Sequence, residues 1–376
     1  MARYPFTSEG EQLDAESIGF PTFTRDSLVE RVVTADIWAY LDHVTRRNLP
    51  ETKEEPALAF LEQARDFYEA AANSSLASRP LLYYYAYLNV AKTLILNSGE
   101  RMNLGVTHGV SDRVNNQQRL HFKTQKVRIG VFDSKKPKDA GRPRHSGLLL
   151  PTLMHVLGPS SSRFFGKEVC VLELLGQLPA IHRTYSTVSG LPGRFLAITK
   201  FEVRRQSGHM WAVAFVPKRH VTEQQYAMLM ASKAFASVFT RVSSRTADQA
   251  SNGCYLFETA KVAYAPRTYR RAITQLSSAI RSAGVWTVAT NRGYRSYFST
   301  IADDKRFPQL AASFAAMYYF GSITRYKPHH FDSLEDKHSW LLSEFLNTDP
   351  VQTLYLTASY IGKTEVVAPY ALHDHL

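Results

Sequence analysis

Two apolar stretches, far apart in the chain, constrain the fold most. Residues 81–96 are apolar around almost the whole circumference of a helix, with Asn89 and Lys92 as the strongly polar exceptions. Residues 310–320 form a second such stretch of small and aromatic residues. A helix that is apolar on all sides has to be buried, and each of these helices needs a partner face. The sequence therefore predicts that they pack directly against each other.

This pairing predicts an α+β fold that is mostly a helical bundle, formed by N- and C-terminal helices and split by a strand-containing insertion. A chain of 376 residues is long enough for one large domain or two ordinary ones, so two tandem domains are the alternative. The expected segments are an acidic N-terminal segment (1–56), the first half of the bundle (57–104), a basic loop with an α/β insertion (105–300), and the second half of the bundle with a tail (301–376).

Periodicity and turn residues predict the other elements. Pro50 to Pro56 is predicted to be a linker, and Gly321-Ser322 the end of the 310–320 helix. The remaining helices are expected over 34–44, 57–72, 147–157, 222–242, 269–282, 332–346 and 351–360, and strands over 126–132, 194–203, 210–216, 253–265 (a pair) and 284–290.

Composition narrows the class of protein. The formal net charge is +12, which favours a polyanionic partner, most often nucleic acid. Two cysteines exclude a disulfide framework and fit a reducing compartment. The N-terminus lacks a signal-peptide pattern, and no stretch of about 18 apolar residues occurs. We therefore expect a cytoplasmic protein that makes no membrane contact.

Positive charge is concentrated in residues 101–145, which hold eleven Lys and Arg against three Asp, a net of +8. One interpretation is a surface that follows a phosphate backbone, and an ordinary solvated loop is the equal alternative. The residues predicted to bind nucleic acid are Lys135, Lys136, Lys138, Arg142 and Arg144.

A junction between two predicted helices carries the candidate chemistry. Arg325 precedes Pro328, which suits the first turn of a helix, and His330 follows it. Helix starts attract anions, an arginine fork can hold two phosphate oxygens, and histidine can move a proton near neutral pH. These parts are the ones that a metal-independent ribonuclease needs, although capping and solvation explain the same residues.

Three short blocks resemble the YaaC-like family of bacterial proteins. They are the stretch 79–92, the pair His108-Gly109, and residues 325–328, which read Arg-Tyr-Lys-Pro. The first block also resembles a helix of HEPN domains, in which a tyrosine pair precedes an alanine-rich, apolar helix.

The HEPN resemblance implies a HEPN-like helical bundle found in toxin and phage-defence proteins. Many of its members are ribonucleases with an arginine followed by a histidine, which here would be Arg325 and His330. It also implies a homodimer or a partner subunit. Active members usually have a small polar residue after the arginine, whereas Tyr326 and Pro328 stand here and favour a protein without catalysis.

We therefore expect a HEPN-like protein that contacts RNA rather than DNA, and a metal-independent endoribonuclease with Arg325 and His330 as catalytic residues. The alternative is a non-catalytic nucleic-acid-binding or scaffold subunit of a bacterial defence complex. No cofactor and no metal are predicted, because no phosphate-binding glycine loop and no convincing set of metal ligands occurs. The candidates for lining the site are Asn89, Lys92, His108, Tyr326 and His329.

Overall fold

The computed structural model describes residues 4–8, 11–17, 31–100, 107–113, 124–130, 148–158, 163–242, 253–290 and 293–369. The fold is α+β, and the chain divides into two compact units, each made of separate stretches of sequence. The helical unit comprises Asp36–Leu191 and Arg306–Gly362, and the sheet unit comprises Met1–Ala35, Pro192–Lys305 and Lys363–Leu376. Residues 105–191 of the predicted insertion thus belong to the helical unit.

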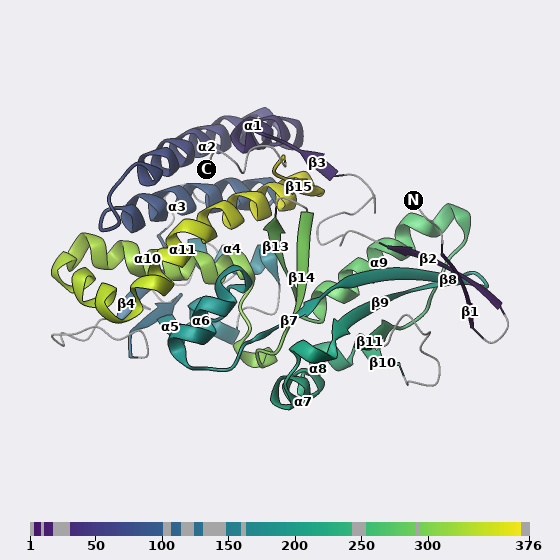
Figure 1. Cartoon of the computed structure of the whole chain (residues 1–376). Coiled ribbons are helices and arrows are strands. Elements are labelled where there is room, and N and C mark those ends of the chain that lie inside the picture. The colour runs from purple at the N-terminus through teal and green to yellow at the C-terminus, as the bar shows by residue number, and fades with distance from the viewer. Residues whose placement is uncertain are drawn as a thin grey trace. The chain divides into compact units, whose positions relative to one another are not determined.

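Long helices dominate the helical unit, and a small antiparallel sheet accompanies them (Figure 1). The strand order in this sheet is β4-β5-β6. The helices are α1 (Ile37–Asn48), α2 (Glu51–Ala72), α3 (Arg79–Asn97), α4 (Leu149–Leu157), α5 (Val171–Leu175), α6 (His182–Ser189), α10 (Gln309–Tyr326) and α11 (Pro328–Gly362), and the strands are β4 (Val110–Arg113), β5 (Lys126–Ile129) and β6 (Glu168–Cys170).

The predicted packing of the two apolar helices is confirmed, because α3 and α10 lie against each other. Gly321 makes this approach possible, since a Cβ at that position would lie 2.9 Å from the Cβ of Tyr84 and 3.3 Å from the carbonyl oxygen of Pro80. The expectation that Gly321-Ser322 ends the helix is wrong, because α10 continues to Tyr326. The glycine serves a close helix contact instead of a helix end.

The predicted linker from Pro50 to Pro56 is also wrong. Helix α2 begins at Glu51, and Pro56 lies inside it. Glu51 and Glu54 occupy the first turn, where negative charge stabilises the positive end of the helix. The shorter α1 before it was expected over 34–44 and begins later, at Ile37, because the Asp36 carboxylate accepts hydrogen bonds from two backbone N–H groups of its first turn.

The residues predicted to form two helices, over 332–346 and 351–360, lie in α11, which consists of two helical segments joined at a kink. It passes through Pro350, where the sequence favours a break, and it is instead kinked at His338 (φ −131°, ψ 18°). The first-turn position predicted for Pro328 is confirmed, since Pro328 begins the helix.

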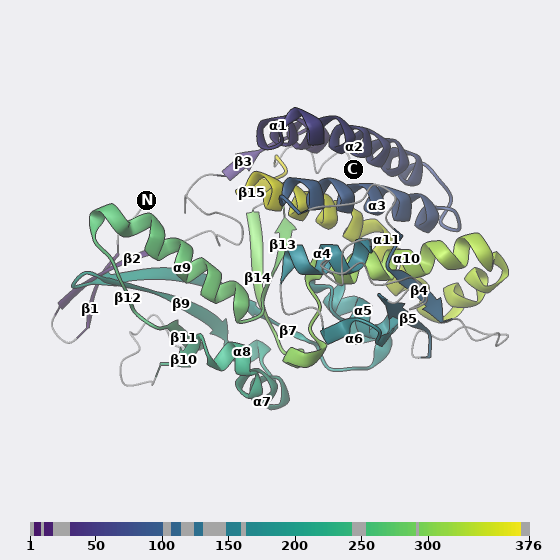
Figure 2. The ribbon, with the colours of Figure 1, turned by 180° about the vertical axis from the view of Figure 1, so that it is seen from behind.

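The sheet unit contains a seven-stranded sheet with the order β1-β2-β8-β9-β11-β10, in which β12 also pairs with β9 (Figure 2). A three-stranded sheet, β13-β14-β7, and a parallel pair, β15-β3, complete the described strands. The bounds are β1 (Tyr4–Ser8), β2 (Glu11–Ser17), β3 (Arg31–Val33), β7 (Phe195–Ile198), β8 (Lys200–Gln206), β9 (His209–Pro217), β10 (Phe239–Arg241), β11 (Cys254–Thr259), β12 (Val262–Ala263), β13 (Val285–Thr290), β14 (Gly293–Ser299) and β15 (Glu365–Val367), with helices α7 (Glu223–Ala231), α8 (Lys233–Ala236) and α9 (Tyr269–Ser282).

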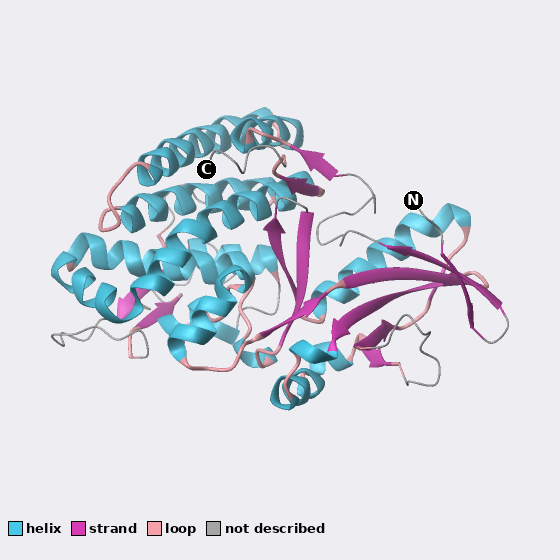
Figure 3. Cartoon of the chain, in the orientation of Figure 1, coloured by secondary structure: helices cyan, strands magenta, loops and turns pink. Residues whose placement is uncertain are grey.

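Alternation along β9 gives the large sheet two different faces. Ala212, Ala214 and Val216 belong to the main core of this unit, together with residues of α7, α8 and α9. Trp211 and its neighbours at every second position form a separate apolar cluster. The predicted hairpin of β8 and β9 and the helix over 269–282 are confirmed (Figure 3).

Two predictions in this unit are wrong in part. The strand expected over 194–203 is divided at Thr199 between β7 and β8, which lie in different sheets. The long helix expected over 222–242 is two short helices and a strand, because the Ser232 hydroxyl caps a second helix by accepting from the N–H of Phe235. Strand β14 was not expected. No helix among the described residues is long and apolar enough to cross a membrane.

Candidate functional site

The polar residues of α3 face its neighbour α2. The Asn89 amide is buried and donates to Oε1 of Gln63 at 3.0 Å. Lys92 places its Nζ 4.5 Å from the centre of the Phe60 ring, and burial lowers the pKa of this lysine. Asn89 is therefore a satisfied residue of the helix interface, whereas Lys92 brings a positive charge into it.

Tyr84 is the centre of a second cluster, on the side of α3 that meets α10. Its hydroxyl hydrogen-bonds with Nδ1 of His108, just before β4, and the two rings are 5.6 Å apart. The rings of Phe314 and Tyr318, one helical turn apart on α10, lie 6.2 and 5.4 Å from the Tyr84 ring. Three segments that are distant in sequence therefore converge on one tyrosine.

The histidine of this cluster is held in its neutral form. Burial lowers the pKa of His108 below its usual range, and the charges of Lys92 and Arg325 lower it further. Burial also raises the pKa of Tyr84, and it raises the pKa of Tyr318 to about 12, with Asp112 as the next cause. At neutral pH the Tyr84–His108 pair is uncharged, and the positive charge of the site comes from Lys92 and Arg325.

Arg325 lies in the last turn of α10 and is exposed. Its Nη1 donates to the hydroxyl of Tyr85 at 3.1 Å, and its guanidinium lies 5.0 Å from the centre of the Tyr326 ring. Tyr326 is 64% exposed, which is unusual for so large a side chain and leaves a ring face open to solvent. Among the side chains that the structure describes, no carboxylate lies within 4 Å of Arg325.

We call this group the Arg325 cluster. Its members share the α3–α10 contact and its exposed rim. They are Tyr84, Tyr85, His108, Tyr318, Arg325 and Tyr326.

The structure joins some of the predicted site residues and leaves others apart. Arg325, Tyr326 and His108 belong to the cluster, and Lys92 acts on it through its charge. Asn89 points to α2 instead. His329 is exposed at the second position of α11. His330 lies on the same first turn, but its side chain is outside the described part of the structure.

The predicted nucleic-acid-binding residues of the basic segment also fall outside the described part of the chain. They are Lys135, Lys136, Lys138, Arg142 and Arg144. Within residues 101–145, the short strand β5 is confirmed and pairs with β4 and β6.

Sequence reasoning missed the three tyrosines that build the cluster, which are Tyr84, Tyr85 and Tyr318. A signal was present, because residues 83–87 contain four tyrosines on a helix that should be buried. Tyrosine hydroxyls in a buried helix need partners, so this run indicated a polar contact on α3.

Sequence reasoning also missed a buried carboxylate. Asp349 of α11 accepts hydrogen bonds from the hydroxyls of Tyr87 (2.8 Å, α3), Ser313 (2.9 Å, α10) and Thr353 (3.5 Å). Burial raises the pKa of Asp349 to about 6, while the three hydroxyl donors act in the opposite direction. This network ties three helices together at one point.

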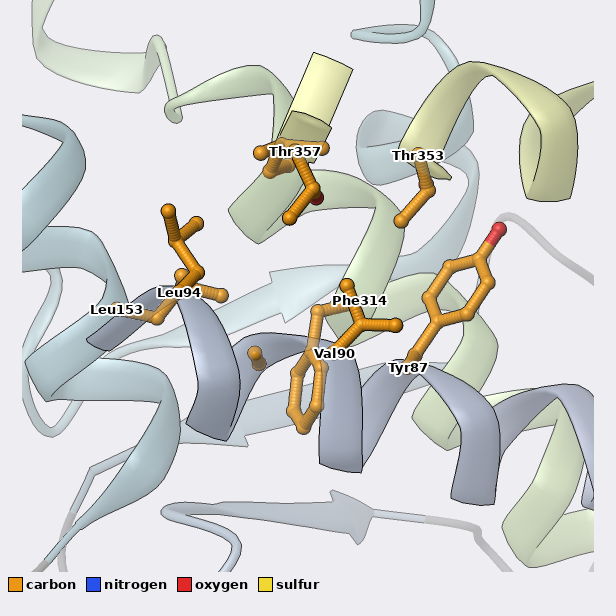
Figure 4. A pocket seen from close by; sticks show the side chains of 9 residues that line it. Tyr87, Val90, Leu94, Leu153, Phe314, Thr353 and Thr357 are labelled. Carbon is orange, nitrogen blue, oxygen red and sulfur yellow. The ribbon is translucent and has the colours of Figure 1, made fainter. Parts of the chain in front are cut away.

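A small cavity adjoins this network (Figure 4). Tyr87 and Thr353, which both bind Asp349, lie on its wall. The other lining residues are mostly apolar: Val90, Ala91, Leu94, Leu153, Leu310, Phe314 and Thr357. The space for the centre of a water molecule is about 10 Å³, which suits a single water at most. The cavity therefore belongs to the packing of the helices and is too small for a substrate.

The Arg325 cluster can support two kinds of chemistry. The Arg325 guanidinium can bind a phosphate through paired N–H donors, and the exposed Tyr326 ring can stack on a base. A neutral histidine such as His108 can accept a proton. No group of three or more histidine, cysteine, aspartate or glutamate side chains with metal-binding geometry occurs in the described part of the chain.

Comparison with known proteins identifies the family. The YaaC-like protein family matches residues 22–361, which covers most of both units. Searches of curated proteins and of solved structures found no match. The family match confirms the resemblance carried by the three short sequence blocks, and it spans the α3 and α10 segments that form the Arg325 cluster. The chain belongs to the YaaC-like protein family.

Proposed function

We propose that the helical unit is a HEPN-like domain that contacts RNA, with the Arg325 cluster as the contact site. One observation carries this proposal. Arg325 is an exposed arginine that a tyrosine holds in place, with a second tyrosine ring open beside it and no described carboxylate within 4 Å. A cation without an acidic partner, next to an open ring, matches the two parts of a nucleotide, its phosphate and its base.

Single-stranded RNA fits this arrangement better than a duplex. Its bases are unstacked and can be placed on aromatic side chains, whereas a duplex hides the base faces. The net charge of +12 would add long-range attraction to any polyanion. The resemblance to HEPN domains extends the proposal to a toxin or phage-defence setting and to a homodimer or a partner subunit.

Binding of a labelled single-stranded RNA to the purified full chain tests the proposal. Arg325→Gln should weaken binding and reduce the dependence on salt, by a slope of about 0.7 for a single phosphate. Tyr326→Ala should weaken binding by about 1–3 kcal/mol. Arg183→Gln, which removes another exposed arginine of the helical unit, is the matched control and should bind as the wild type does. Equal affinities for Arg325→Gln and Arg183→Gln would refute the proposal.

A metal-independent endoribonuclease is the second candidate. The observation that favours it is the short junction between α10, which ends at Tyr326, and α11, which begins at Pro328. Arg325 and His330 flank this junction at the start of the first helical segment of α11, whose N-terminus favours phosphate. In this mechanism His330 would take the proton of a ribose 2′-hydroxyl, and the 2′-oxygen would attack the adjacent phosphorus while the bond from phosphorus to the 5′-oxygen breaks. Arg325 would stabilise the charge that builds on the phosphate, and the leaving 5′-oxygen would take a proton from water.

Cleavage of labelled RNA in the presence of EDTA tests this candidate. Products should carry a cyclic phosphate, and His330→Ala should lower the rate by about a hundred- to ten-thousand-fold while the melting temperature stays the same. Cleavage that persists in His330→Ala would remove this residue from the mechanism. RNA binding without cleavage would support the alternative, a non-catalytic nucleic-acid-binding or scaffold subunit.

A further inference from the structure

The sheet unit carries an exposed group of aromatic and basic residues. The rings of Tyr226 on α7 and Tyr255 on β11 have centroids 4.8 Å apart and are inclined by 32°. The guanidinium of Arg241 on β10 lies 5.6 and 5.3 Å from their centres. Nζ of Lys218, which directly follows β9, lies 5.7 Å from the centre of the Tyr255 ring. We call these four residues the tyrosine platform.

Strand pairing places the platform at one end of the large sheet. Tyr255 is opposite Val216, close to the end of β9, and the backbone N–H of Lys218 donates to the carbonyl oxygen of Gly253 at 2.7 Å. Arg241 is the last residue of β10 and pairs with β11. The positions of Tyr255 and Arg241 therefore follow from strand register, Lys218 directly follows a strand, and Tyr226 is placed by α7.

The tyrosine rings of the platform are fixed before any ligand arrives. Nη1 of Arg241 donates to the hydroxyl of Tyr226 at 3.0 Å. Both tyrosines pack against the main core of the sheet unit, and both stay partly exposed. A rigid ring loses little conformational freedom when a ligand stacks on it, which favours binding.

The charge of the platform is not neutralised by its neighbours. Lys218 and Arg241 are exposed, and no carboxylate lies within 4 Å of either among the side chains that the structure describes. Arg219 and His220 follow Lys218 and are exposed as well. The platform therefore combines two partly exposed tyrosine rings with two cations that no described carboxylate pairs.

We propose that the tyrosine platform binds single-stranded nucleic acid, with a base stacked on the tyrosine pair and phosphates on Lys218 and Arg241. Every base has a π face, so such a surface holds a strand without reading its sequence. An acidic peptide would use the two cations alone, whereas a nucleic acid can in addition stack a base on the partly exposed tyrosine pair. The proposal does not rest on the proposed function, because Arg325 belongs to the other unit.

The test is the affinity of the full chain for two fluorescent oligonucleotides, U12 RNA and dT12 DNA, as a function of salt. Tyr255→Leu, which keeps bulk but removes the ring, should weaken binding about 5- to 150-fold. Tyr255→Phe keeps the ring and should bind as the wild type does. Melting temperatures show whether each variant is folded.

A second pair of variants, Lys218→Gln and Lys261→Gln, tests the contribution of positive charge to binding. Lys218→Gln should weaken binding and reduce the salt slope by about 0.7, the value for one phosphate of a single strand. Lys261→Gln removes a lysine that also lies over an aromatic ring, 4.7 Å from the Trp211 ring centre, in the same unit. Lys261 lies near the opposite end of β9, so the Lys261→Gln variant should bind as the wild type does.

Photo-crosslinking separates this site from the Arg325 cluster. A U12 strand with one 4-thiouridine should crosslink to peptides that contain Tyr226 or Tyr255. Crosslinks restricted to α10, or wild-type affinity in both Tyr255→Leu and Lys218→Gln, would overturn the platform and leave the proposed function standing. Displacement of U12 by poly-glutamate together with unchanged affinity in Tyr255→Leu would show a purely ionic surface and would also overturn it.

Discussion

Gly321 of α10 lies against Tyr84 of α3 so closely that a Cβ on the glycine would stand 2.9 Å from the Cβ and 3.2 Å from the Cγ of the tyrosine. The same tyrosine binds His108, and Arg325, four residues beyond Gly321, binds the neighbouring Tyr85. The close contact between α3 and α10 and the geometry of the candidate site therefore depend on the absence of a side chain at Gly321.

Gly321→Ala should destabilise the protein. Alanine favours a helix by about 1 kcal/mol over glycine, but the added methyl group would push α10 away from Tyr84, and overpacking costs about 1–3 kcal/mol. The melting temperature should fall, and RNA binding at Arg325 should weaken with it. Gly158→Ala is the control, because a Cβ there meets no atom of the described residues within 4 Å. If Gly321→Ala melts as the wild type does, the helices are less closely packed than described.

The buried Asp349 makes a prediction about pH. Its pKa is about 6 in the folded protein against an ordinary value of 3.8, so the folded state binds the proton more tightly than the unfolded state. Stability from this group is therefore present below about pH 4 and is lost as the pH rises to 6 and above, by up to about 3 kcal/mol.

Asp349→Asn removes this titrating group, so a comparison of the wild type with this variant separates the effect of Asp349 on stability from the effects of other acidic residues. Chemical denaturation at several pH values should show the wild type losing stability relative to the variant between pH 4 and 6. A difference that is constant over this range would mean that Asp349 does not titrate there.

The environment of His108 can be measured directly. Burial and the charges of Lys92 and Arg325 hold its pKa below the usual range, so the imidazole should titrate below 6.5 in an NMR experiment. Arg325→Gln removes one positive charge and should raise this pKa, whereas Arg183→Gln should not change it. An unchanged pKa in Arg325→Gln would show that the arginine is too far from the histidine to act on it.

The basic segment yields a prediction that rests on sequence alone. Replacing Lys135, Lys136 and Lys138 by alanine should weaken nucleic-acid binding and flatten its salt dependence, by a slope of about 0.7–0.9 for each phosphate that these lysines neutralise. The control variant replaces the exposed Lys233, Lys261 and Lys305 by alanine, which removes the same amount of charge outside the basic segment. Equal salt slopes of binding for the two triple variants would indicate that the basic segment is a solvated loop.

Several helices were predictable because their residues leave no other choice. The stretch that became α3 is apolar on nearly every side, as is α10, and both had to be buried against a partner. Helix α9 was predicted with its observed bounds, because its apolar residues keep a helical period between a turn and a glycine. In each case the local pattern and the tertiary structure favour the same conformation.

The errors occur where tertiary contacts override a local signal. Pro350 favours a helix break, but α11 continues through it, and the preceding Asp349 is anchored by hydrogen bonds from Tyr87 and Ser313. Gly321 favours a helix end, but the close approach of Tyr84 explains the glycine instead. A sequence pattern does not distinguish a glycine that ends a helix from a glycine that allows a neighbouring side chain to approach closely.

The sequence by itself determined the α+β class, the pairing of α3 with α10 and the basic character of the chain, because these depend on the amount and the period of apolar and charged residues. Only the tertiary structure decided that His108, Arg325 and the tyrosines of α3 share one site, and that Tyr226 and Tyr255 share another. Both sites join residues that are separated in sequence by tens to hundreds of positions, and only the packing of helices and the register of strands bring them together.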